Sequence, residues 1–177
     1  MERFSQEIID RAARVRLLIL DVDGVLTDGT IYLDNEGTEI KGFNIMDGLG
    51  LNLLKNAGIR IGIITGRTSG VVSCRAAELG IKLLVQGCGD KLQAAEEMLA
   101  GEGLSLDETA FVGDDLIDLK LMGKVGLSVS VPGGSPEARA LAHHVTCAHG
   151  GHGAVREVCE LILKSQGLWD KELARFQ

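Results

Sequence analysis

The stretch RLLILDVDGVLTDG (residues 16–29) sets the architecture of this chain. The residues from Val15 to Leu20 are predicted to form a buried strand that runs straight into Asp21. In an open parallel sheet, ligands bind beyond the carboxyl ends of the strands. We therefore expect Asp21 and Asp23 to lie at the mouth of a binding crevice.

On both sides of this stretch, segments with strand patterns alternate with segments with helix patterns. Alternation of this kind predicts a parallel sheet with crossover helices, so we expect an α/β fold, a Rossmann-like three-layer α/β/α sandwich. Ser5 is predicted to cap a first short helix, and Asp47 to cap a later one. The further strands expected are 60–64, 83–85, 110–112, 127–131 and 144–146, and the further helices are 71–79, 91–100 and 154–163.

Two β-prone stretches, 30–33 and 38–43, are joined by the turn sequence Asp34-Asn35-Glu36-Gly37. This arrangement predicts a small β-hairpin, placed at about residues 30–43. Only the hairpin and one helix separate the first acidic motif from the next strand, so there is no room for a large cap domain.

The bulk properties describe one domain that spans residues 1–177, with a loosely tied tail from about residue 167 to 177. The net charge of −7 and the isoelectric point near 5.1 argue against binding to nucleic acid or to an anionic membrane surface. The four cysteines form no CxxC pair, and the N-terminus has no signal-peptide pattern, so we expect reduced thiols in the cytoplasm.

Polar residues follow four of the expected strands, and all four positions should face one crevice. Beyond Asp21 and Asp23, these residues are Thr65 and Arg67 in ITGR, Lys91 in GDK, and Asp114, Asp115 and Asp118 in GDDLID. Acids, a hydroxyl and a lysine that converge in this way suit phosphoryl transfer, which needs positioning and charge neutralisation.

The two carboxylates of the first motif can divide the chemistry between them. Asp21 is the candidate nucleophile, and Asp23 could protonate the leaving alkoxide and later deprotonate water. Lys91 and Thr65 would hold the phosphoryl oxygens. Mg²⁺ prefers hard oxygen ligands, which Asp21, the backbone carbonyl of Asp23 and Asp114 could supply. Asp115 and Asp118 are candidates for residues that lie next to the metal ligands and support them without binding the ion themselves.

The motifs DxDGVxxDG, TGR, GDK and GDDxxD, in this order, resemble the four motifs of the haloacid dehalogenase superfamily. The stretches around residues 28–50, 66–81 and 150–163 look like its small-cap branch, in which the hairpin takes the place of a cap domain. This resemblance implies a Mg²⁺-dependent phosphatase with an aspartyl-phosphate intermediate. It also implies a homotetramer, in which the hairpins of four subunits pack together and a neighbouring subunit helps to close each site.

The resemblance further implies a sugar acid phosphate as substrate, namely 3-deoxy-D-manno-octulosonate 8-phosphate in lipopolysaccharide precursor biosynthesis. Arg67 and Arg75 match positions that grip the substrate carboxylate. The substrate-contacting loop corresponds to Asn44, Ile45, Met46, Asp47 and Gly48. Asn52 departs from the pattern, because the branch often has lysine or arginine there. 2-Keto-3-deoxynononate 9-phosphate therefore stays an alternative substrate.

Two other classes of function share features with this sequence. A phospho-acceptor signalling domain also combines acids, a threonine and a lysine on a parallel sheet, but there the acidic pair comes at the first strand. Here Asp114 and Asp115 follow Lys91. A non-catalytic tetramerisation module is the second alternative, and the complete set of acids weighs against it.

Overall fold

A six-stranded parallel sheet forms the centre of the molecule in the computed structural model, which describes residues 4–177. The strand order is β5-β4-β1-β6-β7-β8, and every pair of neighbours is parallel. The strands are β1 (Leu17–Leu20), β4 (Arg60–Ile64), β5 (Leu83–Val85), β6 (Thr109–Val112), β7 (Leu127–Ser130) and β8 (His144–Val145). The alternating sequence pattern thus predicted the sheet correctly.

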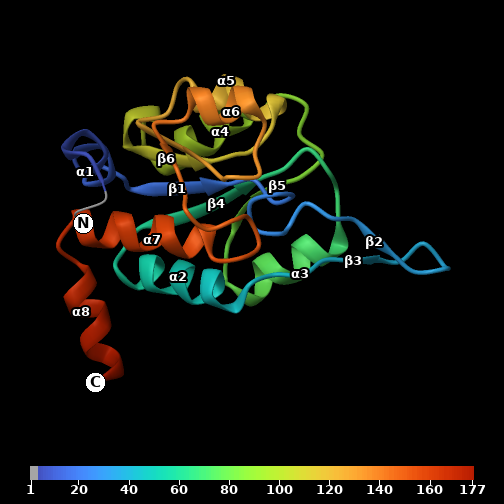
Figure 1. Cartoon of the computed structure of the whole chain (residues 1–177), viewed down its shortest axis with the longest axis horizontal. Coiled ribbons are helices and arrows are strands. Elements are labelled where there is room, and N and C mark those ends of the chain that lie inside the picture. Colours follow the sequence, from blue (N-terminus) through green and yellow to red (C-terminus); the bar gives the residue numbers. More distant parts are fainter. Residues whose placement is uncertain (1–3) are drawn as a thin grey trace.

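Helices cover both faces of this sheet (Figure 1). One face is covered by α2 (Ile45–Asn56), α3 (Gly70–Glu78) and α7 (Ala154–Ser165), with α1 (Gln6–Ala12) packed against α7. The other face is covered by α4 (Lys91–Glu102), α5 (Leu119–Met122) and α6 (Pro136–Leu141). The short 3₁₀ helices η1 (Leu106–Glu108) and η2 (Leu116–Asp118) lie in connections. The predicted three-layer α/β/α architecture is confirmed.

Strand β1 shows why its sequence is apolar throughout. Leu18 and Leu20 point into the core under α2 and α7, whereas Leu17 and Ile19 point into the core under α4 and α5. All four side chains are fully buried, and each contributes roughly 1.5–3 kcal/mol relative to an exposed side chain. Burial on both faces therefore requires a continuous apolar run rather than an alternating one.

The order in which successive strands are added to the sheet changes side at β1. Strands β4 and β5 lie on one side of it, and β6 to β8 lie on the other. The carboxyl ends of β1 and β6 therefore meet at a topological switch point, where a crevice opens in folds of this type.

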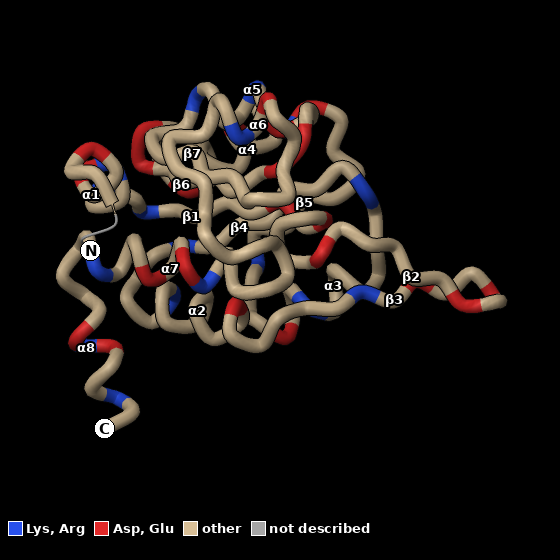
Figure 2. The backbone as a smooth tube through the Cα atoms, in the orientation of Figure 1, with Lys and Arg blue, Asp and Glu red and all other residues tan. Residues whose placement is uncertain are grey.

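The hairpin consists of β2 (Tyr32–Leu33) and β3 (Glu39–Ile40), which pair antiparallel and extend away from the body (Figure 1). The strands are shorter than the β-prone stretches at 30–33 and 38–43. Figure 2 shows acidic positions at the tip of the hairpin. One acid there is structural, because the Asp34 carboxylate accepts the backbone N–H groups of Glu36 and Thr38. Tyr32, Leu33 and Ile40 are 48, 63 and 57% exposed, so this segment buries little of its own apolar surface.

The predicted cap of α2 is wrong. Asn44 caps this helix, and its side-chain oxygen lies 2.8 Å from the N–H nitrogen of Met46. Asp47 lies in the first turn and is 1% exposed. Its carboxylate instead accepts the backbone N–H of Arg156 at 2.7 Å, in the first turn of α7. Helix α7 begins after Gly153, which has no side chain, and Asp47 therefore supplies a cap from another element.

The tail that we expected to be loosely tied is folded into α8 (Trp169–Leu173) and the 3₁₀ helix η3 (Ala174–Phe176). The Trp169 ring packs against the main core, and the Lys164 ammonium lies 4.7 Å from its centroid. Glu172 is 3% exposed. Aromatic packing and a cation–π contact thus hold Trp169, at the start of this segment, against the core. None of the helices within residues 4–177 has the length and apolar content needed to cross a membrane.

Candidate active site

Three acids meet at the switch point between β1 and β6. Asp21 directly follows β1, Asp114 lies in the loop after β6, and Asp118 ends η2. One carboxylate oxygen from each residue lies within 4.8 Å of the others. Asp118 is fully buried, and its Oδ2 accepts the N–H groups of Asp114 at 2.9 Å and Asp115 at 3.1 Å. The predicted supporting residue Asp118 therefore shapes the loop that carries Asp114.

Lys91 lies between two of these acids as the first residue of α4. Its Nζ is 2.9 Å from Asp21 Oδ2 and 2.6 Å from Asp118 Oδ1, and its side chain is 1% exposed. Asp90 fixes the start of the helix by accepting the N–H groups of Leu92 and Gln93. Burial alone would lower the pKa of Lys91, but the two carboxylates outweigh it, and the pKa lies above its ordinary value. The lysine is therefore a permanent cation beneath the site.

The cluster carries more negative charge than Lys91 can neutralise. Burial raises the pKa of Asp21 to about 6, with Lys91 opposing the shift. Burial also raises the pKa of Asp114 to about 7, and the charges of Asp21 and Asp118 add to this effect. A second cation would relieve the repulsion, and an all-oxygen set of this kind suits Mg²⁺.

The backbone around the first motif is built to approach Asp114 closely. Gly24 has φ +87°, and a Cβ added there would lie 2.0 Å from a carboxylate oxygen of Asp114. A glycine is therefore required where the loop after β1 passes this acid. The same approach keeps the Asp23 backbone near Asp114, which fits the predicted magnesium ligands Asp21, Asp23 carbonyl and Asp114.

A pocket of about 250 Å³ opens above the cluster. Most of the residues predicted from the four motifs line it. They are Asp21, Asp23, Thr65, Arg67, Asp114 and Asp115, together with Gly29, Gly66 and Ile117. Lys91 and Asp118 lie buried below. Residues that are widely separated in sequence are therefore brought together as the motif order predicted.

Sequence reasoning missed two residues of this region, Glu39 and Lys41, which come from the hairpin. The Lys41 ammonium pairs with Oδ1 of Asp23 and lies 3.3 Å from Glu39 Oε1, and its side chain is 1% exposed. Arg67 is shared by the same two acids, at 2.9 Å from Glu39 and 3.7 Å from Asp23. Glu39 and Lys41 are two residues apart in a β-prone stretch, and residues with this spacing share one face of a strand. That spacing was the available signal that both side chains point the same way.

The remaining predicted substrate contacts do not line this pocket. Arg75 pairs with Glu78 at 2.8 Å, and its guanidinium lies 5.7 Å from the centroid of the Phe43 ring. Gly48 packs against Arg75 so tightly that an added Cβ would lie 2.5 Å from its Nη2. Asn44, Ile45, Met46 and Asp47 belong to the start of α2, and Asn52 is exposed further along it. Contact between these residues and a substrate stays a prediction.

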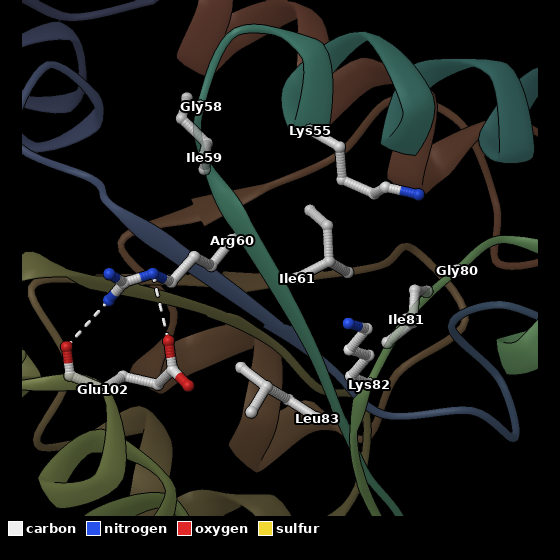
Figure 3. A pocket seen from close by; sticks show the side chains of 10 residues that line it. All are labelled: Lys55, Gly58, Ile59, Arg60, Ile61, Gly80, Ile81, Lys82, Leu83 and Glu102. Atoms are coloured by element: carbon white, nitrogen blue, oxygen red, sulfur yellow. Dashed lines mark hydrogen bonds and ion pairs between the residues drawn. The ribbon is translucent and has the colours of Figure 1, made fainter.

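A separate pocket of about 360 Å³ lies at the opposite end of the sheet, near the start of β4 and β5 (Figure 3). Its charges are largely satisfied within the protein. Arg60 pairs with Glu102 at 3.0 Å, and the Lys55 ammonium donates to the carbonyl of Leu79. No group of metal-ligating acids borders it within residues 4–177. The chemistry of the molecule is therefore concentrated at the switch point.

Comparison with known proteins agrees with this geometry. Residues 84–158 match the haloacid dehalogenase-like hydrolase family. The 3-deoxy-D-manno-octulosonate 8-phosphate phosphatase of Yersinia pestis is 49% identical over 162 residues, which cover 92% of this chain and 87% of that protein. Its counterpart from Escherichia coli K12 is 48% identical, with 94% and 89% covered.

Among solved structures, the phosphatase of the same name from Moraxella catarrhalis superimposes with a TM-score of 0.96 at 48% identity. The match covers 98% of this chain and 100% of that one, and that structure is a complex with a magnesium ion, a phosphate ion and a KDO molecule. The buried acids, the pocket and these relatives lead to one conclusion: the chain belongs to the 3-deoxy-D-manno-octulosonate 8-phosphate phosphatases, which are phosphoric monoester hydrolases of the haloacid dehalogenase type.

Proposed function

We propose that this protein hydrolyses 3-deoxy-D-manno-octulosonate 8-phosphate to the free sugar acid and phosphate. The observation that carries the proposal is the cluster of Asp21, Lys91, Asp114 and Asp118 at a pocket that is also lined by Asp23 and Arg67. The relatives named for this reaction support the choice of substrate. This reaction belongs to the biosynthesis of lipopolysaccharide precursors.

In the first step, Asp21 attacks phosphorus and the bond from phosphorus to the sugar oxygen breaks. Lys91 engages Oδ2 of Asp21 at 2.9 Å and so orients the carboxylate. Asp23 gives a proton to the leaving alkoxide and ends as a carboxylate. The product of this step is an aspartyl phosphate and the free sugar acid.

In the second step, Asp23 takes a proton from water, and the resulting hydroxide attacks the phosphorus of the aspartyl phosphate. The bond from phosphorus to Asp21 breaks, which restores the carboxylate and releases phosphate. Thr65, which is 2% exposed and lines the pocket, is placed to hold a phosphoryl oxygen. Mg²⁺, held by Asp21, Asp114 and the Asp23 carbonyl, supplies charge neutralisation for the phosphoryl group.

Recognition of the sugar acid is assigned to Arg67, because it is the arginine that lines the pocket with Asp21. A guanidinium binds a carboxylate in a planar, two-point fashion that a lysine cannot reproduce. Arg75 is the second candidate, and it would act from outside this pocket.

The decisive experiment measures phosphate release from the octulosonate 8-phosphate, the deoxynononate 9-phosphate and an aryl phosphate, with Mg²⁺ and with EDTA. We expect the highest kcat/KM for the octulosonate phosphate and no turnover with EDTA. A preference for the nine-carbon substrate would reassign the sugar. An aspartyl phosphate that persists for minutes without turnover would indicate a signalling domain, and an inert tetramer would indicate a structural module.

We also propose that the protein is a homotetramer in the cytoplasm, with the hairpins of four subunits packed together. The support for assembly is the exposed apolar surface of the hairpin and the neighbouring start of α2. Its residues are Ile31, Tyr32, Leu33, Ile40, Ile45, Met46 and Leu49. Contiguous apolar surface of this kind usually marks an interface. The unpaired cysteines suit a reducing compartment.

A further inference from the structure

Glu39 in strand β3 and Lys41 directly after it turn their charged side chains toward Arg67 and Asp23, whereas the apolar side chain between them faces away. Glu39 and Lys41 are 17% and 1% exposed at the side chain, whereas Ile40 between them is 57% exposed. This alternation follows from the two-residue period of an extended strand. The hairpin therefore contributes a carboxylate to the edge of the active site as well as an outer apolar face.

The Glu39 carboxylate is fully engaged by donors from two other segments. Its Oε1 lies 2.9 Å from Nη2 of Arg67, and its Oε2 accepts a hydrogen bond from the hydroxyl of Ser69. Ser69 occupies the N-cap position of α3, yet its hydroxyl does not cap that helix. These hydrogen bonds hold the pKa of Glu39 below its ordinary value, so the group is an anion at neutral pH.

Arg67 consequently presents one edge of its guanidinium, Nε and Nη2, to carboxylates of the protein. Nη2 is occupied by Glu39, and Nε faces Oδ2 of Asp23 at 3.7 Å. A substrate carboxylate needs two neighbouring N–H groups of one guanidinium to bind in the two-point manner. A substrate carboxylate that binds the Nε and Nη2 edge in this manner must therefore displace Glu39.

We propose that Glu39 occupies the carboxylate-binding edge of Arg67 when no substrate is bound. The substrate carboxylate then displaces Glu39 from Arg67 and thereby loosens the hairpin from the pocket. This inference rests on the proposed function, in which Arg67 recognises a sugar acid. The exchange leaves no buried charge alone, because Lys41 at 3.3 Å and Ser69 remain as partners of Glu39. A phosphate ester without a carboxylate cannot make the exchange at Arg67, so Glu39 acts as a filter for acidic substrates.

The test compares Glu39→Gln with Glu36→Gln. Glu36 lies in the exposed turn of the same hairpin, and its replacement removes the same charge without touching Arg67. Two quantities are measured for each variant: the KM ratio of the octulosonate phosphate to an aryl phosphate, and the inhibition constant of the free sugar acid. Thermal melting confirms that both variants fold.

For Glu39→Gln we expect both quantities to fall by about two- to five-fold, the range that a half-exposed ion pair supports. Glu36→Gln should leave them unchanged. Equal or higher values for Glu39→Gln would overturn the inference, because Glu39 would then position Arg67 rather than compete at it.

Arg67→Ala separates this inference from the proposed function. A selective rise in the KM of the sugar acid phosphate, combined with no effect of Glu39→Gln, rejects the filter and leaves the proposed function intact. An equal rise for both substrates removes Arg67 from carboxylate recognition and rejects the filter as well. The proposed function itself fails if the wild-type protein releases no phosphate from the octulosonate ester, and this result is obtained before any variant is measured.

Discussion

The acid cluster and the hairpin both contact residues that line the pocket, yet they are held in place by different forces. Asp21, Lys91 and Asp118 have side chains that are at most 7% exposed, and they come from the end of β1, the start of α4 and the end of η2. The hairpin has strands of two residues each, and its apolar side chains face outward. The difference indicates that the acid cluster is held by the core, whereas the hairpin is a segment whose apolar side chains need a partner surface.

Replacing the nucleophile tests the core side of this comparison and should give the largest effect. Asp21→Asn should lower kcat by at least about a thousand-fold, because an amide is a poor nucleophile and a poor metal ligand. Phosphate release in single-turnover and steady-state assays measures the loss. Asp10→Asn, on the exposed face of α1, is the matched control. Retention of more than a few per cent of activity would remove Asp21 from its role.

Removing the buried cation tests how far the core depends on its charge balance. Lys91→Met leaves Asp21 and Asp118 uncompensated and should lower the free energy of unfolding by about 3–5 kcal/mol. Urea denaturation without Mg²⁺ measures this loss in the free energy of unfolding. Adding Asp118→Asn to Lys91→Met should restore part of the loss. A change below about 1 kcal/mol would show that water reaches the pair and screens it.

The raised carboxyl pKa values predict an unusual dependence of stability on pH in metal-free protein. The pKa of Asp114 rises from 3.8 in the unfolded chain to about 7, and that of Asp21 to about 6. The folded state therefore holds these protons more tightly, and the associated stability is full below pH 4 and lost as pH rises through 6 and 7. Melting temperatures in EDTA between pH 5 and 8 measure this contribution.

Mg²⁺ supplies the internal control for that measurement, because it binds the deprotonated acids. The rise in melting temperature on adding Mg²⁺ should grow from pH 5 to pH 8. An increment that does not change with pH would mean that the acids are already ionised in the metal-free protein.

The two arginines test where recognition lies. Arg67→Ala should raise the KM of the octulosonate phosphate about ten-fold more than that of an aryl phosphate, because only the former carries a carboxylate. Arg75→Ala should show the same selectivity if it reaches the substrate from its place beside Glu78. Equal effects on both substrates would exclude the arginine concerned from the recognition site.

The smallest effect on stability is expected in the hairpin. Leu33→Asp should change the free energy of unfolding of the isolated subunit by less than about 0.5 kcal/mol, because the side chain is 63% exposed. The same substitution should disrupt the tetramer, which light scattering after size-exclusion chromatography measures. Thr38→Asp, in the turn, is the control for added charge. An intact tetramer would place the interface elsewhere.

The sequence by itself determined the sheet and the order of its motifs, and it predicted which residues would lie at the candidate site. Those features depend on local patterns: apolar runs predict the strands, and the residue after each strand must lie at one edge of a parallel sheet. Asp21, Thr65, Lys91 and Asp114 could be placed in this way because each follows a strand within two residues or begins a helix.

Only the tertiary structure decided what Asp47, Lys41, Glu39 and Trp169 contact. Asp47 caps a helix 109 residues further along the chain, and Lys41 pairs with Asp23 across 18 residues. Side chains like these have several possible partners of equal chemistry. The partner is chosen by which elements pack together, and local sequence patterns do not contain that information.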